Sequence, residues 1–162
     1  MKKILFLLFI TIGLFANAQV KKADLRASGL TCAMCSKAVY KSLSAIPFVD
    51  KINVDIQKST YEIIFKSGIG VDFDALSRAV VDAGFSVAQL QVTSVFNGVK
   101  AQKGAKIELG DKTIQFINGT DQLLSGEKKF TLVDKNFVSA KEFKKYSLTA
   151  GKTYESGFAD GK

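Results

Sequence analysis

The feature that most constrains the fold is the order of two hydrophobic spacings between residues 22 and 92. Apolar residues recur at steps of three and four, as in amphipathic helices, over 36–46 and 73–83. Strand signals, mostly alternating apolar and polar residues, occupy four further segments, 22–27, 52–56, 61–65 and 86–92. The predicted order is strand, helix, strand, strand, helix, strand. We therefore expect an α+β domain with a ferredoxin-like βαββαβ arrangement, in which both helices cover one face of an antiparallel sheet.

Three residues set limits to the two predicted helices. Pro47 cannot continue the first helix, because its ring fixes φ and removes a backbone donor. Asp72 is a good N-cap for the second helix, and Gly84 is a good stop signal after it. The first helix is predicted to start at the cysteine pair Cys32 and Cys35.

The residue pattern changes after residue 93. From there on, glycines separate short apolar runs. We divide the chain into residues 1–18, 19–93 and 94–162. The last part is predicted to be a small, mainly β domain of the oligonucleotide/oligosaccharide-binding type, with one helical stretch over 139–146 and a frayed end after residue 151. Its aromatic residues are expected to be core side chains, and they are Phe116, Phe130, Phe137, Phe143 and Tyr146.

The two cysteines, Cys32 and Cys35, are the candidate functional residues. A disulfide between them would close a very short loop and constrain the unfolded chain little, so we interpret the pair as chemical. A helix N-terminus favours the thiolate form, which is the form that binds metals. Cu(I) is readily coordinated by two sulfurs, whereas a structural zinc site needs four donors, and the chain has no histidine. Hg(II) is also readily coordinated by two thiolates.

The loop 29–35, Gly-Leu-Thr-Cys-Ala-Met-Cys, lies between the first predicted strand and helix and resembles the heavy-metal-associated domain of copper chaperones, copper-pump N-termini and mercury-binding proteins. Segments 46–49, Ile-Pro-Phe-Val, and 82–85, Asp-Ala-Gly-Phe, are similar to other parts of that family's pattern. The resemblance covers about residues 22–92. Leu30 stands where the family usually has methionine, and Phe48 where glycine is common, and neither change removes a metal ligand.

The resemblance implies a function and several residue roles. Cys32 and Cys35 would hold Cu(I), Hg(II) or another soft metal, and a metal-donor or metal-acceptor protein would supply a further thiolate during transfer. Phe85 matches a bulky residue that shields the metal loop in this family, and the alternative is an ordinary core phenylalanine. Met34 is expected to be an exposed side chain rather than a third ligand, and Lys37 an ordinary solvated lysine.

The first 18 residues have the pattern of a secretory signal peptide. Lys2 and Lys3 precede the apolar run 4–15, and Ala-Asn-Ala at 16–18 is a small-x-small cleavage site before Gln19. We expect cleavage near Ala18/Gln19, a periplasmic or secreted protein, and no stable membrane insertion afterwards, since the run is shorter than a membrane span.

Other functions fit the sequence less well. The net charge of +8 is spread along the chain, which does not favour nucleic-acid binding. We expect no enzyme, since no paired carboxylates, histidine or serine-centred motif appears. The rival function is a dithiol–disulfide oxidoreductase with Cys32 as nucleophile and Cys35 as resolving thiol. A third interpretation has an oxidised, idle cysteine pair and a partner-binding second half.

Overall fold

A computed structural model describes residues 19–30, 32–109 and 112–150. The predicted signal peptide, Thr31 and the predicted frayed end lie outside these ranges. The elements follow one another in the order β1 Gln19–Ser28, α1 Ala33–Ser44, β2 Val49–Asp55, β3 Thr60–Phe65, α2 Phe73–Asp82, β4 Ser86–Ala101, β5 Lys106–Leu109, β6 Lys112–Gln115, β7 Gln122–Leu132 and α3 Ala140–Ala150.

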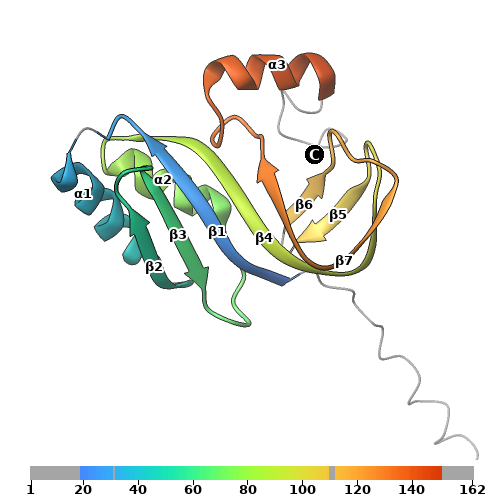
Figure 1. The fold of residues 1–162 in the computed structure, drawn as a ribbon, viewed down its shortest axis with the longest axis horizontal. Helices are drawn as coiled ribbons and strands as arrows, with labels where there is room; N and C mark the ends of the chain where they lie inside the picture. The colour runs from blue at the N-terminus through green and yellow to red at the C-terminus, as the bar shows by residue number, and fades with distance from the viewer. Residues whose placement is uncertain (1–18, 31, 110–111, 151–162) are drawn as a thin grey trace, which may run out of the picture.

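Five strands form an antiparallel sheet in the order β2-β3-β1-β4-β7, and α1 and α2 lie on one face of it (Figure 1). The first four strands and the two helices follow the predicted order strand, helix, strand, strand, helix, strand. The two central strands, β1 and β3, are paired with each other and flanked by β4 and β2. The predicted ferredoxin-like arrangement is confirmed, with a mainly β region after it.

The main core lies between this sheet and the two helices. Alternate residues of the strands point toward the helices, because successive side chains of a strand lie on opposite faces. The predicted apolar stripes of both helices meet them there. Members of this core with no solvent exposure are Ala23, Leu25, Val39, Leu43, Tyr61, Ile63, Leu76, Val80, Leu90 and Val92.

Helix α2 begins and ends as its sequence predicts. The Asp72 side chain caps it by accepting a hydrogen bond from the backbone N–H of Asp74, with a distance of 3.0 Å between Oδ1 and N. Arg78, one turn further on, reaches back to the same carboxylate at 2.9 Å. At the other end, Gly84 has φ +87°, a left-handed conformation that glycine adopts without a steric cost. These contacts fix where the segment between α2 and β4 leaves the helix.

Strand β4 is longer than predicted and runs through the expected domain boundary at residues 93 and 94. Its N-terminal part pairs with β1, and β7 pairs with it from Leu90↔Leu132 to Ala101↔Gln122. The sequence contains a strand signal at 130–133, in the C-terminal part of β7. It does not show that β7 pairs with β4, because one strand pattern fits many partners. The division into two domains stays a prediction, and β4 belongs to both of the proposed parts.

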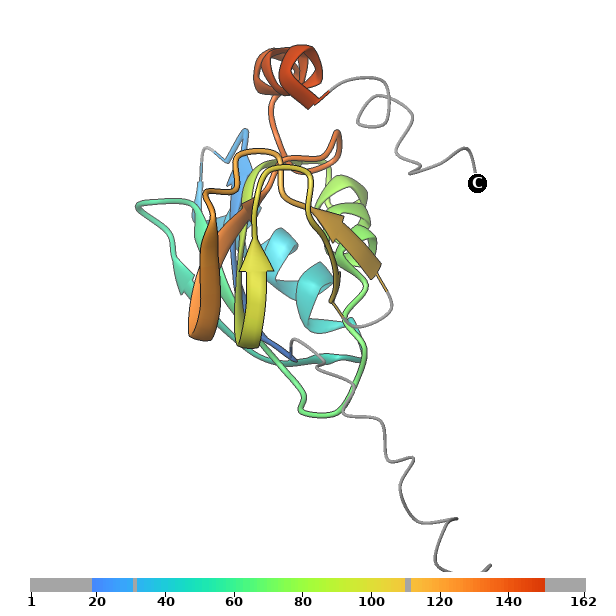
Figure 2. The same ribbon diagram turned by 90° about the vertical axis from the view of Figure 1, so that its right-hand side faces the viewer.

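The second half of the chain is built on a bent two-stranded ribbon. Beyond residue 101 the ribbon turns sharply and continues as the separate β5–β6 sheet (Figure 2). Gly119 lies at the bend, where a Cβ would come within 2.7 Å of the backbone of Gln102. The two backbone segments can approach so closely only because residue 119 is a glycine. Among residues 19–109 and 112–150, as far as they are described, the pairings close no barrel of the oligonucleotide/oligosaccharide-binding type.

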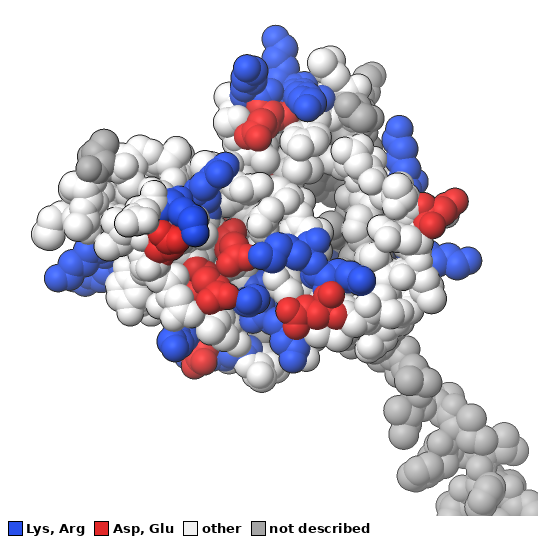
Figure 3. All heavy atoms as spheres, viewed as in Figure 1, with Lys and Arg blue, Asp and Glu red and all other residues white. Residues whose placement is uncertain are grey.

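The sheet face away from the helices carries acidic and basic side chains side by side (Figure 3). Lys22 contacts Glu62 at 2.7 Å, and Lys129 of β7 contacts Asp24 of β1 at 2.6 Å. Surface pairs of this kind contribute little to stability individually, about 0–1 kcal/mol. On this face, basic side chains are thus paired with acidic ones. No helix in the described part of the chain is long and apolar enough to cross a membrane.

Candidate metal site

Helix α1 begins at the cysteine pair, and Cys32 is its N-cap. The backbone of Cys32 is extended, with φ −153° and ψ 163°, while its carbonyl oxygen accepts the first helical hydrogen bond from Ser36 N at 3.2 Å. Its Sγ atom accepts a hydrogen bond from the backbone N–H of Cys35 at 3.4 Å. A sulfur in this position receives a donor that a helix N-terminus otherwise leaves unpaired, which favours negative charge on it.

The Sγ atoms of Cys32 and Cys35 are 2.7 Å apart, and both side chains are thiols. Cys32 is exposed and Cys35 is half-buried. Metal–thiolate bonds are about 2.3 Å long in zinc sites, so an ion bonded to both sulfurs needs them somewhat further apart. Cys32 is the exposed member of the pair, so an ion would reach the two sulfurs from the solvent side.

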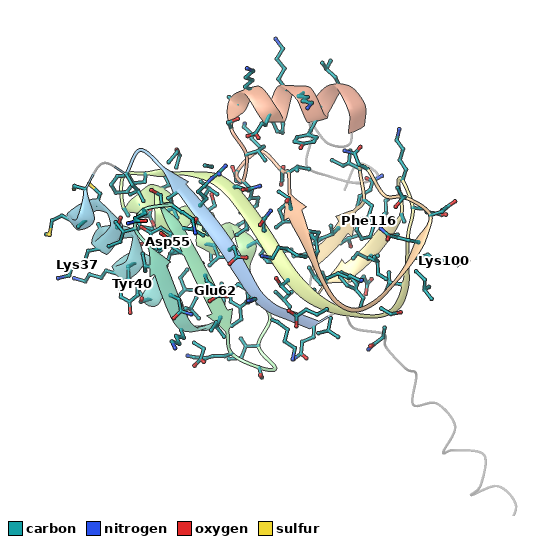
Figure 4. All side chains as sticks on the ribbon, viewed as in Figure 1. Lys37, Tyr40, Asp55, Glu62, Lys100 and Phe116 are labelled. Atoms are coloured by element: carbon teal, nitrogen blue, oxygen red, sulfur yellow. The ribbon has the colours of Figure 1, made fainter. Side chains whose placement is uncertain are left out.

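The charge around the pair favours an anionic complex. The first turn of α1 contains no acidic residue, and the N-terminal end of the helix dipole faces the sulfurs. Lys37 is exposed on the same helix (Figure 4), as expected of a solvated lysine. Met34 is 72% exposed, which matches the prediction for the variable position between the cysteines. Within the described residues, no group of three or more His, Cys, Asp or Glu side chains is placed to hold a metal.

Two sheet contacts and one glycine position the start of the loop. The end of β1 lies beside the start of β4, where the hydroxyl oxygens of Ser28 and Ser86 lie 2.6 Å apart. The backbone N–H of Ala27 donates to the carbonyl oxygen of Ser59 in the β2–β3 turn at 3.1 Å. The chain then leaves the sheet at Gly29, whose φ of +84° directs it toward the cysteines.

Phe85 lies next to this loop, as its position in the sequence predicts. A Cβ placed on Gly29 would be 3.7 Å from Cδ1 of the Phe85 ring, which is ordinary van der Waals contact. Both Phe85 and Leu30 are partly buried against the core. Leu30 thus remains an apolar support beneath the loop, and Phe48, the other departure from the family pattern, is buried in a tilted ring contact with Phe65 at 6.0 Å.

Tyr61 is a residue of the site that sequence reasoning missed. It comes from β3, it has no solvent exposure, and its hydroxyl donates to the carbonyl oxygen of Ser36 at 3.2 Å. Burial raises the pKa of Tyr61, and the nearby charge of the Cys35 thiolate raises it further. The available signal was a tyrosine among apolar residues on the buried side of a strand, because a buried hydroxyl needs a partner.

The comparison with protein families identifies the same region. Residues 24–86 match the family model described as the heavy-metal-associated domain. This range contains both cysteines, Phe85 and Tyr61, and it confirms the resemblance that the sequence motifs indicated. Neither this match nor the fold tests whether Cys32 and Cys35 are the metal ligands, which stays a prediction.

Several known proteins are similar to this segment. A probable copper-exporting P-type ATPase of Archaeoglobus fulgidus is 30% identical over 66 residues, or 41% of this chain and 8% of the ATPase. Copper-transporting ATPase 1 of Rhizobium meliloti is 32% identical over 87 residues, or 54% of this chain and 10% of the ATPase. The solved structure of oxidized MerP from Ralstonia metallidurans CH34 is 27% identical and covers 42% of this chain and 96% of MerP, with a TM-score of 0.38. The chain thus spans about a tenth of the length of these ATPases.

Proposed function

Because residues 24–86 are a heavy-metal-associated domain, we propose that this protein binds Cu(I) between the thiolates of Cys32 and Cys35 and exchanges it with a partner protein. The observation that carries the proposal is the placement of two adjacent sulfurs at the N-terminus of α1, one of them exposed. The copper-transporting ATPases similar to this segment support copper as the metal.

The chemistry of the donors favours a soft ion of low coordination number. Thiolates select soft metals such as Cu(I), while Mg²⁺ and Ca²⁺ prefer oxygen ligands. Tetrahedral zinc needs four donors, and one chain presents two sulfurs here. Hg(II) also fits two thiolates, so metal competition is needed to distinguish it from copper.

The exposure of the site favours transfer over storage. An ion held by two sulfurs at an exposed helix cap remains open on the solvent side, where a partner's thiolate is able to approach it. Exchange through such a shared intermediate moves the metal without releasing it to water. The partner that we propose is therefore a metal donor or acceptor protein with its own cysteines.

We also propose that the protein works outside the cytoplasm, in the periplasm or after secretion. The support is the pattern of the first 18 residues, with Lys2 and Lys3, the apolar run 4–15 and the site at Ala18/Gln19. Expression with the native N-terminus and mass measurement of the exported product tests this. A mass that begins at Gln19 supports export with cleavage, and an uncleaved protein in the cytoplasm contradicts it.

The test of metal binding is an anaerobic Cu(I) titration of reduced residues 19–162 against a competing chelator. We expect one tightly held ion per chain, and loss of that binding in the Cys32→Ser/Cys35→Ser variant. Met34→Leu is the matched control, because it keeps the volume of the loop side chain and removes only the thioether. Retained binding in the double variant would refute the assignment of the ligands.

Two further measurements separate the alternatives. Titration of the copper-loaded protein with Hg(II) shows which metal the site prefers, and displacement at equal concentrations would replace copper by mercury in the proposal. The reduction potential of the cysteine pair, together with an assay for disulfide exchange, tests the oxidoreductase. Rapid catalysis of exchange without tight copper binding would favour that rival.

A further inference from the structure

The second half of the chain contains a cavity that the metal site does not use. It has a volume of about 380 Å³, toward the low end of the range of about 300–1,000 Å³ typical of small-molecule sites. Its lining comes from β4, β7, the bend at 116–119 and Tyr146 of α3.

Four aromatic residues contribute to the lining, namely Phe96, Phe116, Phe130 and Tyr146. Phe96 is almost fully buried, and its ring centroid lies 6.0 Å from that of Phe130 at an interplanar angle of 59°. Phe116 and Phe130 are only partly buried, although they pack against the core. Figure 4 shows Phe116 within the bend of the ribbon. These rings were expected to be ordinary core residues, yet Phe116, Phe130 and Tyr146 each present a surface to the cavity.

One cation on the cavity wall has no counter-charge among the residues that the structure describes. Lys128 lines the cavity and forms no ion pair with any described carboxylate, whereas its neighbour Lys129 is held by Asp24 at 2.6 Å. None of the described residues that line the cavity is acidic. The wall therefore combines a positive charge with aromatic rings. An apolar molecule with one anionic group would match both features.

A buried hydroxyl lies directly across from that lysine. In the register of β4 and β7, Ser94 pairs with Lys128, and Val92 with Phe130. Strand alternation puts Ser94 on the same face as Phe96, which lines the cavity. The Ser94 hydroxyl is fully buried and has no hydrogen-bond partner in the described protein. Ser94 itself is not among the residues that line the cavity, so the case for a ligand rests on Lys128 and the aromatic rings.

We propose that this cavity binds a small aromatic monocarboxylate. Its ring system packs against Phe96, Phe116 and Phe130, and its carboxylate lies beside Lys128. The proposal is independent of the metal site, because it uses none of the residues near the cysteine pair. It assigns the mainly β region a ligand of its own, in addition to any role in positioning the metal domain.

The probe is 1-naphthoate, with the neutral 1-naphthamide as its isostere, and binding is followed by NMR chemical shifts of residues 19–162. We expect naphthoate to bind with a Kd of about 1 mM or tighter and naphthamide to bind at least about threefold more weakly. Lys128→Gln should remove that difference. Lys100→Gln is the matched control, since Lys100 is an exposed lysine on the outer part of the same ribbon (Figure 4).

Two other variants locate the binding. Phe116→Ala should weaken both probes, and its fold is checked by its thermal transition because the ring is only partly buried. The Cys32→Ser/Cys35→Ser protein should bind naphthoate as the wild type does, which separates this proposal from the metal-binding one. No binding at several millimolar, equal binding of the two probes, or unchanged affinity in both Lys128→Gln and Phe116→Ala would overturn the proposal.

Discussion

The hydroxyl of Tyr61 in β3 donates a hydrogen bond of 3.2 Å to the carbonyl oxygen of Ser36 in the first turn of α1. This bond connects the centre of the sheet to the turn that holds Cys35. Ser36 is itself buried, whereas Cys32 is exposed and Cys35 is half-buried. The orientation of the metal loop thus depends on a contact between residues 25 positions apart.

Removing this hydroxyl should destabilise the protein without abolishing metal binding. In Tyr61→Phe the Ser36 carbonyl loses its side-chain donor, so we expect a loss of about 1 kcal/mol in the free energy of unfolding. Urea denaturation measures it. Tyr40→Phe is the control, because Tyr40 is 42% exposed on the same helix and should change stability little. Equal effects of the two changes would contradict a special role for the buried hydroxyl.

The raised pKa of Tyr61 predicts a loss of stability in alkali. A group whose pKa is higher in the folded than in the unfolded protein stabilises the fold fully below its ordinary value, here about 10. That contribution declines as pH rises through the folded pKa. The stability advantage of the wild type over Tyr61→Phe should therefore shrink between pH 9 and about 11. Urea titrations at several pH values measure it, and a constant difference would argue against the buried, raised pKa.

Gly29 should be needed for metal binding as well as for stability. Its φ of +84° is unfavourable for alanine, so Gly29→Ala is expected to cost about 1 kcal/mol and to shift the loop against Phe85. We expect weaker Cu(I) binding in the chelator titration. Gly68→Ala is a matched control with φ +76° and open space around its Cβ. It should lose similar stability but keep the copper affinity, and a parallel loss of copper affinity would refute the argument.

The cap of α2 should contribute most at neutral pH. Burial opposes ionisation of Asp72, but Arg78 and the backbone N–H groups of Ala75 and Asp74 outweigh it and hold the pKa of Asp72 below its ordinary value. Its stabilisation is therefore present above about pH 4 and is lost as pH falls through the folded pKa. Asp72→Ala should cost about 1 kcal/mol at pH 7 and less at pH 3, measured by urea denaturation. Asp50→Ala, at an exposed position, should be neutral at both.

The two halves of the chain should unfold together. The buried Ser77 of α2 donates to the carbonyl oxygen of Asn136 at 3.1 Å, and Phe137 beside it is buried. Ser77→Ala removes this connection, and we expect a loss of about 1 kcal/mol and still one transition, because β4 is shared. Fluorescence and far-UV circular dichroism should report the same midpoint. Two separated transitions in the wild type would instead support independent domains.

The candidate site was predictable in large part because its signals are local. A pair of cysteines three positions apart at the start of an apolar helical stripe marks both the helix N-terminus and the donor atoms. Asp72 and Gly84 likewise identify the ends of α2 through their own backbone preferences. The first helix was predicted to start at the cysteine pair, and it does, with Cys32 as an N-cap whose Sγ atom accepts a hydrogen bond from the backbone N–H of Cys35.

The sequence by itself therefore determined the order of the first six elements, the core faces of the two helices and the position of the sulfurs, since periodicity and capping act over a few residues. Only the tertiary structure decided that β7 pairs with β4, that Tyr61 donates a hydrogen bond to α1, and that Phe116, Phe130 and Tyr146 line a cavity. Strand pairing, burial and cavities depend on which distant segments meet, and a single strand pattern is compatible with many partners.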